Sequence, residues 1–368
     1  MSRIASFVKR ETVLCISWFL AVFSLFFAPQ NADFLSYIDF KTLALLFCLM
    51  AVMAGFSSAG IFEFCAGSLL KKTKSIRSVQ LTLILLCFCF SAIITNDVAL
   101  ITFVPFTITV LTLAQKTQLI PITVILQTVA ANMGSCVTPI GNPQNIYIFS
   151  ISNLSIRDFA LIMLPYSAVT LAVLLLFLLF SKNYSTQTMT ESLTAVNIKD
   201  TVFFSLLFII SVLAVFGVVN YILCFILVLS ALLIFKRKII LKIDYSLLLT
   251  FIGFFIFVGN MGNVPLIKEL IEKMLLGKEV VFSALISQLI SNVPAALLLS
   301  GFTDNMQNLL IGVNIGGLGT LIASMASLIS YKYVAVALPD KKGKYVVLFS
   351  IINFVLLIIM LLINFLSQ

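Results

Sequence analysis

The stretch Ser91-Ala-Ile-Ile-Thr-Asn-Asp97 is a polar tip between two apolar arms, and it is followed by the broken helical pattern Ala131-Asn-Met-Gly-Ser-Cys-Val-Thr-Pro-Ile-Gly-Asn-Pro-Gln-Asn145. The second half repeats this order with Ser287-Gln-Leu-Ile-Ser-Asn-Val-Pro294 and Val313-Asn-Ile-Gly-Gly-Leu-Gly-Thr-Leu-Ile-Ala-Ser324. Laid over each other without a gap, the broken segments match Asn132 with Asn314, Gly134 with Gly316 and Thr138 with Thr320. Polar runs that interrupt helices at corresponding places in two apolar halves indicate the binding site of a secondary transporter.

The composition is that of an integral membrane protein. Hydrophobic residues make up 61% of the chain and charged residues 10%, and the mean hydropathy is +1.17. Apolar runs of spanning length recur from end to end, which excludes a soluble globular protein. We therefore expect an all-α polytopic protein in the lipid bilayer of the cell (inner or plasma) membrane. The first apolar run lacks a small-residue cleavage site, so it is predicted to be a retained helix behind a cytoplasmic N-terminus.

The apolar runs predict about nine spanning helices. They are Val13–Ala28, Thr42–Ile61, Leu119–Ser150, Phe159–Phe180, Val202–Val219, Tyr221–Phe235, Leu247–Val258, Leu309–Tyr333 and Val346–Leu366. Segments 79–113 and 280–301 are predicted to be two re-entrant hairpins, because a polar tip at bilayer depth is tolerated only where protein or a water-filled cavity covers the backbone. The spans at 119–150 and 309–333 contain the polar runs and are predicted to be broken helices.

The distribution of charge supports this topology. With the N-terminus inside, all but five of the 23 basic residues fall on the cytoplasmic side, as the positive-inside rule requires. The net charge of +9 is thus explained without nucleic acid as a partner. An odd number of crossings separates corresponding helices, so the repeats are predicted to be inverted. Residues 1–181 form the first repeat, 182–200 a cytoplasmic linker, and 201–368 a connecting helix and the second repeat.

Three motifs together resemble the ion transporter superfamily. They are Thr95-Asn-Asp-Val-Ala-Leu-Ile-Thr-Phe-Val-Pro-Phe106, Thr138-Pro-Ile-Gly-Asn-Pro-Gln-Asn145 and Ser291-Asn-Val-Pro294. The chain is most similar to the arsenite permease and citrate transporter branch of anion permeases, and more distantly to the divalent anion/sodium symporters. The resemblance implies a scaffold domain that forms a homodimer and a transport domain of hairpins and broken helices that moves as an elevator. The symporters carry Ser-Asn-Thr at both tips, whereas this chain has Thr95-Asn-Asp97 and Ser291-Asn-Val293.

The polar residues at bilayer depth need polar partners. Glycines allow the breaks to unwind and free carbonyl oxygens, and carbonyl, amide and hydroxyl oxygens are hard ligands of the kind that coordinate Na⁺. The candidate coupling-cation residues are Asn96, Asp97, Asn132, Gly134, Asn292, Asn314, Gly316 and Gly319. Half-helix N-termini beyond each break offer N–H groups to an anion. The candidate substrate residues are Thr95, Asn96, Thr138, Gly141, Asn142, Ser291, Asn292, Thr320 and Ser324. Taken singly, each Gly or Asn also fits close helix packing or an interhelical hydrogen bond.

Asp97 is the only acid predicted to lie deep in the membrane, which makes it a candidate functional residue. Three roles remain open. The carboxylate either stays ionised beside Asn96 as a Na⁺ ligand, or carries a proton, or caps the N-terminus of a helix that begins at Val98. The sequence contains no His, the usual proton relay partner, and this favours sodium.

The sequence predicts a secondary active transporter of a small anion, coupled to Na⁺ or H⁺. Because there is no His, there is no Ser-His-Asp triad, and no phosphate-binding loop of the Walker type is present. We therefore expect no enzymatic activity and no cofactor, with Na⁺ as the one candidate ion. The alternatives are an exporter of the arsenite or antimonite type, a sodium/proton antiporter on the same scaffold, and an anion channel.

Overall fold

The structure is a computed structural model that describes residues 11–27, 34–70, 73, 75–180 and 196–367. All regular structure within these ranges is helical. The helices are α2 (Thr12–Ser24), α3 (Phe40–Ala59), α4 (Ile61–Leu70), α5 (Ile76–Ile94), α6 (Asn96–Leu113), α7 (Ile120–Ser135), α8 (Pro143–Ile151), α9 (Ile156–Phe180), α10 (Ile198–Val215), α11 (Tyr221–Phe235), α12 (Arg237–Ile240), α13 (Tyr245–Gly262), α14 (Pro265–Leu275), α15 (Glu279–Ile290), α16 (Asn292–Leu299), α17 (Met306–Ile315), α18 (Met325–Ala337) and α19 (Lys342–Ser367).

The prediction of an all-helical, multi-span membrane protein is confirmed, but the count of spans differs. Seven helices among the described residues are long and apolar enough to cross a membrane, namely α3, α5, α6, α9, α10, α13 and the C-terminal helix from Pro339 to Ser367. Two of them, α5 and α6, are the arms of the first predicted hairpin. The predicted crossings at 13–28, 119–150, 221–235 and 309–333 are represented by shorter helices, because they are either short or interrupted by non-helical residues.

Parts of the prediction lie outside the described residues. The linker predicted at 182–200 is described only from residue 196, and the N-terminal residues 1–10 and residue 28 of the first predicted crossing are likewise not described.

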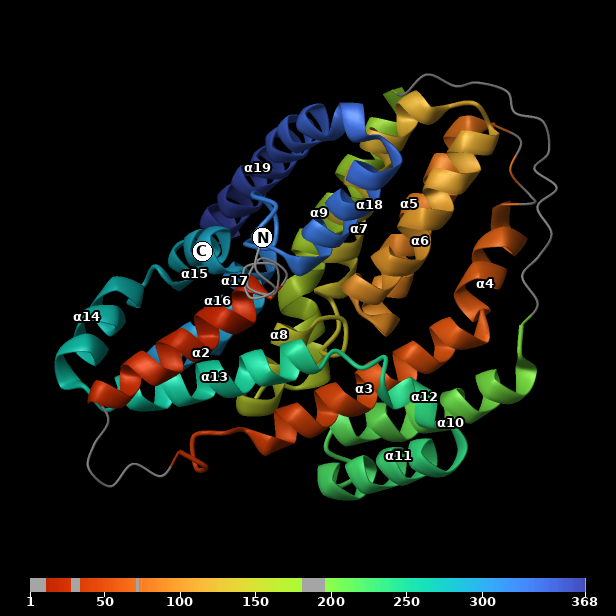
Figure 1. Cartoon of the computed structure of the whole chain (residues 1–368). Helices are drawn as coiled ribbons and strands as arrows, with labels where there is room; N and C mark the ends of the chain where they lie inside the picture. Colours follow the sequence, from red (N-terminus) through yellow and green to blue (C-terminus); the bar gives the residue numbers. More distant parts are fainter. Residues whose placement is uncertain (1–10, 28–33, 71–72, 74, 181–195, 368) are drawn as a thin grey trace, which may run out of the picture.

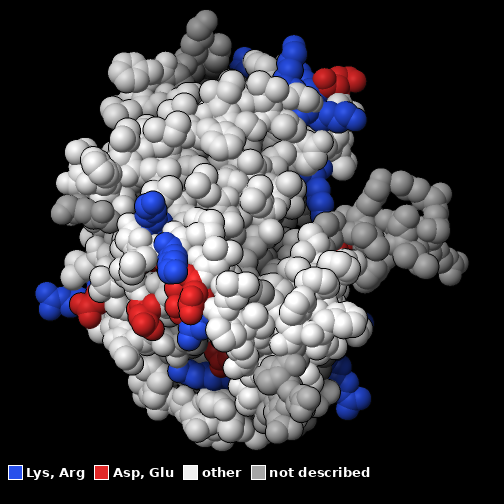
Figure 2. All heavy atoms as spheres, turned by 90° about the vertical axis from the view of Figure 1, so that its left-hand side faces the viewer, with Lys and Arg blue, Asp and Glu red and all other residues white. Residues whose placement is uncertain are grey.

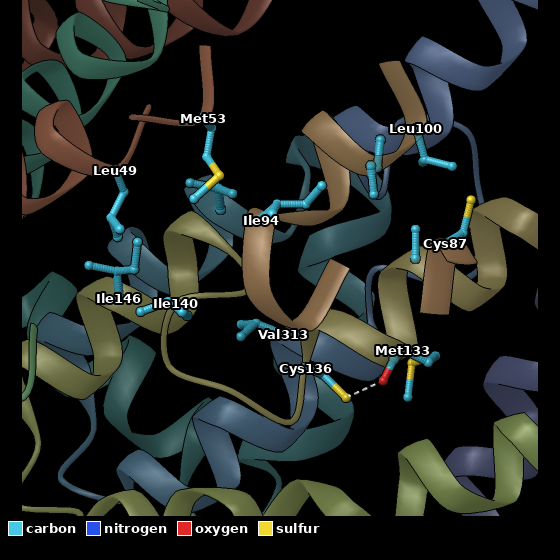
Figure 3. Packing of buried hydrophobic residues seen from close by; sticks show 14 of the residues in the cluster. Leu49, Met53, Cys87, Ile94, Leu100, Met133, Cys136, Ile140, Ile146 and Val313 are labelled. Carbon is cyan, nitrogen blue, oxygen red and sulfur yellow. Dashed lines mark hydrogen bonds between the residues drawn. The ribbon is translucent and has the colours of Figure 1, made fainter. Parts of the chain in front are cut away.

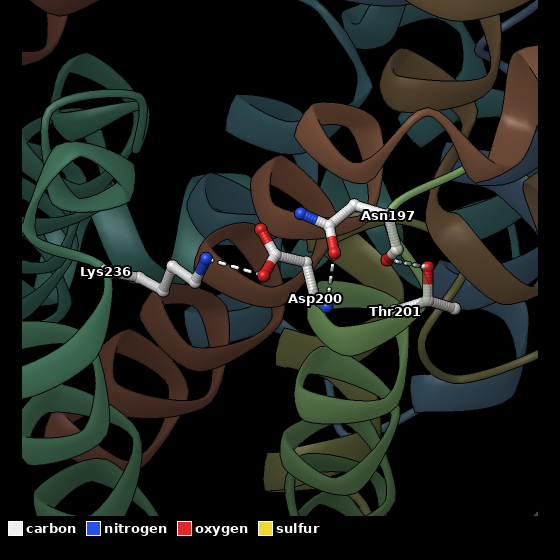
Figure 4. Close-up of polar contacts among 4 residues, drawn as sticks. All are labelled: Asn197, Asp200, Thr201 and Lys236. Carbon is white, nitrogen blue, oxygen red and sulfur yellow. Dashed lines mark hydrogen bonds and ion pairs between the residues drawn. The ribbon is translucent and has the colours of Figure 1, made fainter. Parts of the chain in front are cut away.

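One group of helices is formed by α2, α3, α10, α11 and α13. In Figure 1, α2 lies along α13, and α10 and α11 lie along α3, consistent with the helix contacts. The start of α10 is fastened to both neighbours. The backbone N–H of Asn197 donates to the carbonyl of Ala59 at 3.1 Å, and Lys236 at the end of α11 forms an ion pair with Asp200 at 2.6 Å (Figure 4). We call this group the scaffold helices.

The second group contains the polar segments. Helices α5, α6, α7 and α18 run side by side in Figure 1, and α15, α16 and α17 pack together at another part of the molecule. We call α5–α8 and α15–α18 the core helices. They place buried polar residues such as Asn132 and Asn314 among apolar side chains.

The outside of the molecule matches the predicted membrane location. Large apolar side chains such as Phe180, Leu206 and Phe365 are exposed. Figure 2 shows a surface that is mostly uncharged, with acidic and basic side chains gathered in a few small groups. Such a surface is suited to lipid and not to water.

Candidate functional site

Each polar tip reverses the chain at one residue with an unusual backbone. Helix α5 ends at Ile94 and α6 begins at Asn96, with Thr95 between them at φ 76° and ψ 150°. Helix α15 ends at Ile290 and α16 begins at Asn292, with Ser291 at φ 77° and ψ 154°. This region is sparsely populated by residues other than glycine and costs about 1–3 kcal/mol. The same strained corner therefore occurs at matching positions of the two halves.

Each tip docks on the non-helical segment of its own half. The backbone N–H of Asn96 donates to the carbonyl of Gly141 at 3.1 Å, and that of Asn292 donates to the carbonyl of Ala323 at 2.9 Å. The hydroxyl of Thr138 donates to the carbonyl of Ala92 at 2.5 Å. In the second half, the hydroxyl of Thr320 donates to the carbonyl of Gln288 at 3.1 Å. Tip and break thus form one unit in each half, with the same two contacts.

Side chains from both halves meet between these units. The carboxamide oxygen of Asn132 accepts from the Asn96 amide at 3.0 Å and from the Ser324 hydroxyl at 3.1 Å. The amide of Asn314 donates to the Asn145 oxygen at 2.8 Å. All of these side chains are buried.

Further amides and a hydroxyl complete this set. The Asn142 amide donates to the Ser135 hydroxyl at 2.7 Å and lies 3.5 Å from the Asn314 oxygen, and the Gln144 amide lies at the same distance from that oxygen. We define the polar cluster as Asn96, Asn132, Ser135, Asn142, Gln144, Asn145, Asn314 and Ser324. It consists of neutral amides and hydroxyls only.

The helices that begin at the polar cluster carry open N-termini. Asn142 precedes α8 and Ser324 precedes α18, and neither side chain caps its helix. Pro143 has no N–H, and the N–H groups of Asn145 and Ser327 donate to the carbonyls of Asn142 and Ser324. The positive dipole ends and the remaining first-turn N–H groups are what these two helices offer to an anion.

Two of the predicted glycines allow the hairpins to pack directly on neighbouring helices. A Cβ atom on Gly134 of α7 would collide with the backbone carbonyl of Phe88 on α5. A Cβ atom on Gly316, which follows α17, would lie 2.8 Å from the Cα of Ala284 on α15. These two residues therefore set the distance between hairpin and break, in addition to any role as carbonyl ligands.

The first tip also borders a cavity of roughly 300 Å³. Thr95 and Asp97 line it together with Leu49 and Met53 of the scaffold helix α3 and Ile146 of α8. Figure 3 shows the side chains of Leu49, Met53 and Ile146 in this region, close to Ile94 and Ile140. Ser58, Lys242 and Asp244 also line the cavity, and the Lys242 ammonium donates to the Ser58 hydroxyl at 2.7 Å. The cavity thus lies between a scaffold helix and the core helices.

Asp97 occupies the first turn of α6 and is not its cap. The hypothesis of a cap for a helix starting at Val98 is wrong, because α6 starts at Asn96 and Thr95 precedes it. The backbone N–H of Asp97 donates to the Asn96 side-chain oxygen at 2.8 Å. Its Oδ1 atom is buried and accepts no hydrogen bond from the residues that the structure describes. Asp97 therefore presents an unpaired oxygen next to the cavity, separate from the polar cluster.

The predicted site residues thus fall into four places. The polar cluster contains Asn96, Asn132, Asn142, Asn314 and Ser324; the docking contacts involve Thr138, Gly141, Asn292 and Thr320; close packing involves Gly134, Gly316 and Gly319; and the tips themselves hold Thr95, Asp97 and Ser291.

Four polar residues in these places were not predicted, namely Ser135, Gln144, Asn145 and Gln288. Gln144 and Asn145 belong to the polar run that was quoted as a motif, so their signal was present. Gln288 lies in the quoted stretch Ser287–Pro294, but only its contacts show what it does. Its amide donates to the carbonyls of Gly316 and Leu318 at 2.8 and 2.9 Å.

The donor set speaks against a transition-metal site. No group of three or more His, Cys, Asp or Glu side chains occurs among the described residues. Amide, hydroxyl and carbonyl oxygens suit a hard cation such as Na⁺ instead.

Known proteins are similar to this chain, two of those described below over most of its length. The citrate transporter family matches residues 4–313. An uncharacterized transporter of Methanocaldococcus jannaschii is 36% identical over 304 residues, which cover 80% of this chain and 81% of that protein. The inner membrane protein YbiR of Escherichia coli is 31% identical over 312 residues, or 83% and 82% of the two chains. The silicon efflux transporter LSI3 of Oryza sativa is 34% identical over 144 residues, which are 39% of this chain and 29% of that protein.

These matches confirm the resemblance to citrate transporters and the expectation that the chain is not an enzyme. They also agree with the seven candidate spans of a multi-pass membrane protein. The chain belongs to the citrate transporter family, and it is a secondary transporter for which family membership indicates an anion as substrate.

Proposed function

We propose that this protein moves a small anion across the cell membrane in a cycle coupled to Na⁺ or H⁺. The observation that carries the proposal is the pair of matched tips, which dock on their own breaks, together with the bonds of Asn132 and Asn314 that join the two halves. Buried amides are costly in an apolar medium unless they are paired, so a cluster of this size implies a use beyond packing.

The anion binds where the two open helix N-termini meet the tips. Candidate contacts are Thr95, Asn96, Thr138, Gly141 and Asn142 in the first half, and Ser291, Asn292, Thr320 and Ser324 in the second. Since the polar cluster is neutral, helix dipoles, hydroxyls and a bound cation must balance the charge of the anion. This arrangement suits a small anion with one or two charges.

The coupling cation binds at the oxygens of the tips and breaks. The candidates remain Asn96, Asp97, Asn132, Gly134, Asn292, Asn314, Gly316 and Gly319. The unpaired Oδ1 of Asp97 supports either a Na⁺ ligand or a proton carrier. Of the two roles, Na⁺ ligand is favoured over proton carrier, because the sequence has no His to relay protons.

We infer an elevator mechanism built on two inverted repeats. The cavity between α3 and the core helices supports it, since that is where one domain would slide past another. The matched tip contacts support the repeat, and the odd number of predicted crossings supports its inversion. We further infer that α5–α6 and α15–α16 are re-entrant hairpins, because Asn96 and Asn292 are buried.

The scaffold helices form the interface of a homodimer in this proposal. Helices α10 and α11 carry exposed apolar side chains, including Leu206, Ile209, Ile222 and Leu227. A second copy would bury part of this face. Stepwise photobleaching of labelled protein in a bilayer checks it, and single-step bleaching would argue for a monomer.

A second candidate is the export of an uncharged hydroxide, by which we mean an undissociated weak oxyacid such as silicic or arsenous acid. Two observations favour it. The polar cluster contains no charged side chain, and one relative is a silicon efflux transporter.

Charge movement in proteoliposomes tests both candidates. The purified protein is given an imposed Na⁺ gradient and, separately, a pH gradient, with a panel of oxyanions, carboxylates, silicic acid and arsenite. Saturable current that requires Na⁺ and one anion would support the first candidate and identify its substrate. Flux of an uncharged hydroxide with no current carried by an anion would support the second. Uncoupled anion current without exchange would instead indicate a channel.

A further inference from the structure

Gln288 places its amide nitrogen among three backbone carbonyl oxygens. Nε2 lies 3.0 Å from the carbonyl oxygen of Ala284, 2.8 Å from that of Gly316 and 2.9 Å from that of Leu318. Its Oε1 accepts from the backbone N–H of Thr320 at 2.8 Å. One side chain of the second hairpin thus contacts four backbone groups of α15 and the break.

Three converging carbonyl oxygens form the kind of pocket that holds a hard cation. An amide NH₂ group carries only two hydrogens, so three acceptors around it are more than it needs. The position of Nε2 is therefore one in which a cation would be equally well placed. Unlike a bound ion, the Gln288 amide is covalently attached to the chain and cannot dissociate from this pocket.

The matching positions of the first half carry no such side chain, and their backbone differs in that Val137 lacks the positive φ of Gly319. Ala92 stands at the position that matches Gln288, since Thr138 bonds to its carbonyl as Thr320 bonds to that of Gln288. Phe88, Gly134 and Cys136 match Ala284, Gly316 and Leu318. Among the described residues, no side chain donates a hydrogen bond to the carbonyl of Gly134 or Cys136.

A second difference accompanies the first. A Cβ atom on Gly319, which has a φ of 107°, would collide with Oε1 of Gln288. The matching residue in the first half is Val137, opposite the small Ala92. The pair Gln288 and Gly319 thus replaces the pair Ala92 and Val137, and the glycine makes room for the longer side chain.

Two buried side-chain oxygens beside the tip and break of the first half have no partner among the described residues, while in the second half Asn260, Ser327, Tyr345 and Asn353 hold such oxygens away from the tip. Oδ1 of Asp97 and Oδ1 of Asn142 are buried and accept no hydrogen bond from any described residue. Within 287–292 and 314–324, the described tip and break of the second half, no buried side-chain oxygen is in this condition. Two oxygens that a cation could pair with therefore lie beside the tip and break of the first half.

We propose that the amide of Gln288 permanently fills one of two matched oxygen-lined pockets, so that the transporter binds a single coupling cation, in its first half. This inference rests on the cation coupling proposed above and adds the number and the place of the ion. It assigns to Gln288 the role of an internal substitute for a second ion.

The test is a Na⁺ titration of the purified full-length protein against choline at constant ionic strength. Thermal unfolding reports binding, and radioactive Na⁺ per anion in proteoliposomes reports coupling. For the natural protein we expect a Hill coefficient of about 1, with one Na⁺ per anion. Gln288→Ala opens the second pocket and raises the coefficient toward about 2, with one additional Na⁺ per anion.

The reciprocal variant is Ala92→Gln with Val137→Gly, which rebuilds the glutamine pair in the first half. We expect it to fold and to lose the Na⁺-dependent rise in Tm. The matched control is Gln127→Ala, because Gln127 is a buried glutamine of α7 that donates to the carbonyl of Leu83, away from the tips. It should lower Tm without changing the number of Na⁺ ions.

The outcomes separate this inference from the proposed function. If the natural protein shows no Na⁺ dependence in either measurement, both sodium coupling and this inference are refuted. One Na⁺ per anion in both the natural protein and Gln288→Ala would overturn the inference alone, as would two in the natural protein. If Gln288→Ala does not fold, Gln288→Glu replaces it. Its carboxylate needs a cation among the carbonyls, so it should fold in Na⁺ and not in choline, and indifference to Na⁺ would contradict the proposal.

Discussion

At the scale of single residues, Asn132 and Asn314 hold the polar cluster together. Asn132, Asn314, Asn96, Asn142 and Ser324 could be predicted from sequence, because each interrupts an apolar pattern at matched positions. Which residues pair could not be predicted, since Asn145 bonds to Asn314 and Ser324 to Asn132 from the opposite half of the chain. Hydrophobic periodicity reports burial within one helix, and it carries no information on contacts between helices far apart in sequence.

Asn96→Ala should abolish coupled transport and leave the protein folded. The substitution removes the donor to Asn132, and the loss of one buried hydrogen bond costs about 1–3 kcal/mol. Radiotracer uptake in proteoliposomes measures transport, and the Tm of the purified variant measures the fold. Asn292→Ala should behave in the same way. Normal coupled uptake by a folded variant of either kind would refute the site.

Asp97→Asn should weaken Na⁺ binding at least tenfold, or about 1.4 kcal/mol. The variant keeps the shape of the side chain and removes a negative charge next to the first tip. Asp244→Asn is the matched control, because Asp244 lines the same cavity but is exposed to solvent, where salt screens its charge. The measurement is the Na⁺ concentration at half-maximal stabilisation. Equal values for Asp97→Asn and the natural protein would exclude the carboxylate from the cation site.

At the scale of helices, the interrupted segments are the elements that sequence describes least well. A single run at 119–150 has the composition of one long span, yet the structure contains α7 and α8 with non-helical residues between them. Gly and Asn indicate that a helix can break, but the place where it does so depends on the hairpin that docks there. The bond from Asn96 to Gly141 is an example of such a contact.

Gly134→Ala should disrupt the packing of α5 on α7. The added methyl group meets the backbone carbonyl of Phe88, which cannot move without moving the helix. Overpacking of this kind costs about 1–3 kcal/mol, so we expect a lower Tm and loss of transport. Gly262→Ala is the control, because nothing lies within 4 Å of its added methyl group. If both variants have the Tm and activity of the natural protein, the close approach of α5 to α7 is not required.

At the scale of the whole molecule, composition alone predicts a helical membrane protein, and that prediction is confirmed. The arrangement of scaffold and core helices follows from packing between apolar surfaces that all look alike in sequence. Leu49 of α3 and Ile146 of α8 are both apolar residues in apolar runs, and nothing in either run indicates that they line one cavity.

Linking the scaffold to the core should stop transport if the core moves. Met53 of α3 and Ile146 of α8 line the same cavity. Each is replaced by cysteine in a variant from which the natural cysteines have been removed. A reducible bifunctional thiol reagent then joins the two new cysteines. We expect uptake to be lost on linking and restored on reduction. The control retains only Cys48 and Cys224, whose sulfurs lie 3.8 Å apart within the scaffold. Joining them should leave uptake unchanged, and full uptake by the linked Met53 and Ile146 variant would contradict an elevator.

Under the proposed elevator mechanism, Asp97 would make transport sensitive to voltage. Its carboxylate belongs to a core helix, and while it is ionised and without a cation it carries one negative charge with that helix. A charge that crosses the full field experiences about 2.3 kcal/mol per 100 mV. In a cell with a negative interior, this force would favour the empty protein with its first tip toward the outside. A single Na⁺ beside Asp97 would cancel the charge, so the voltage dependence of the empty protein and that of the Na⁺-bound protein should differ.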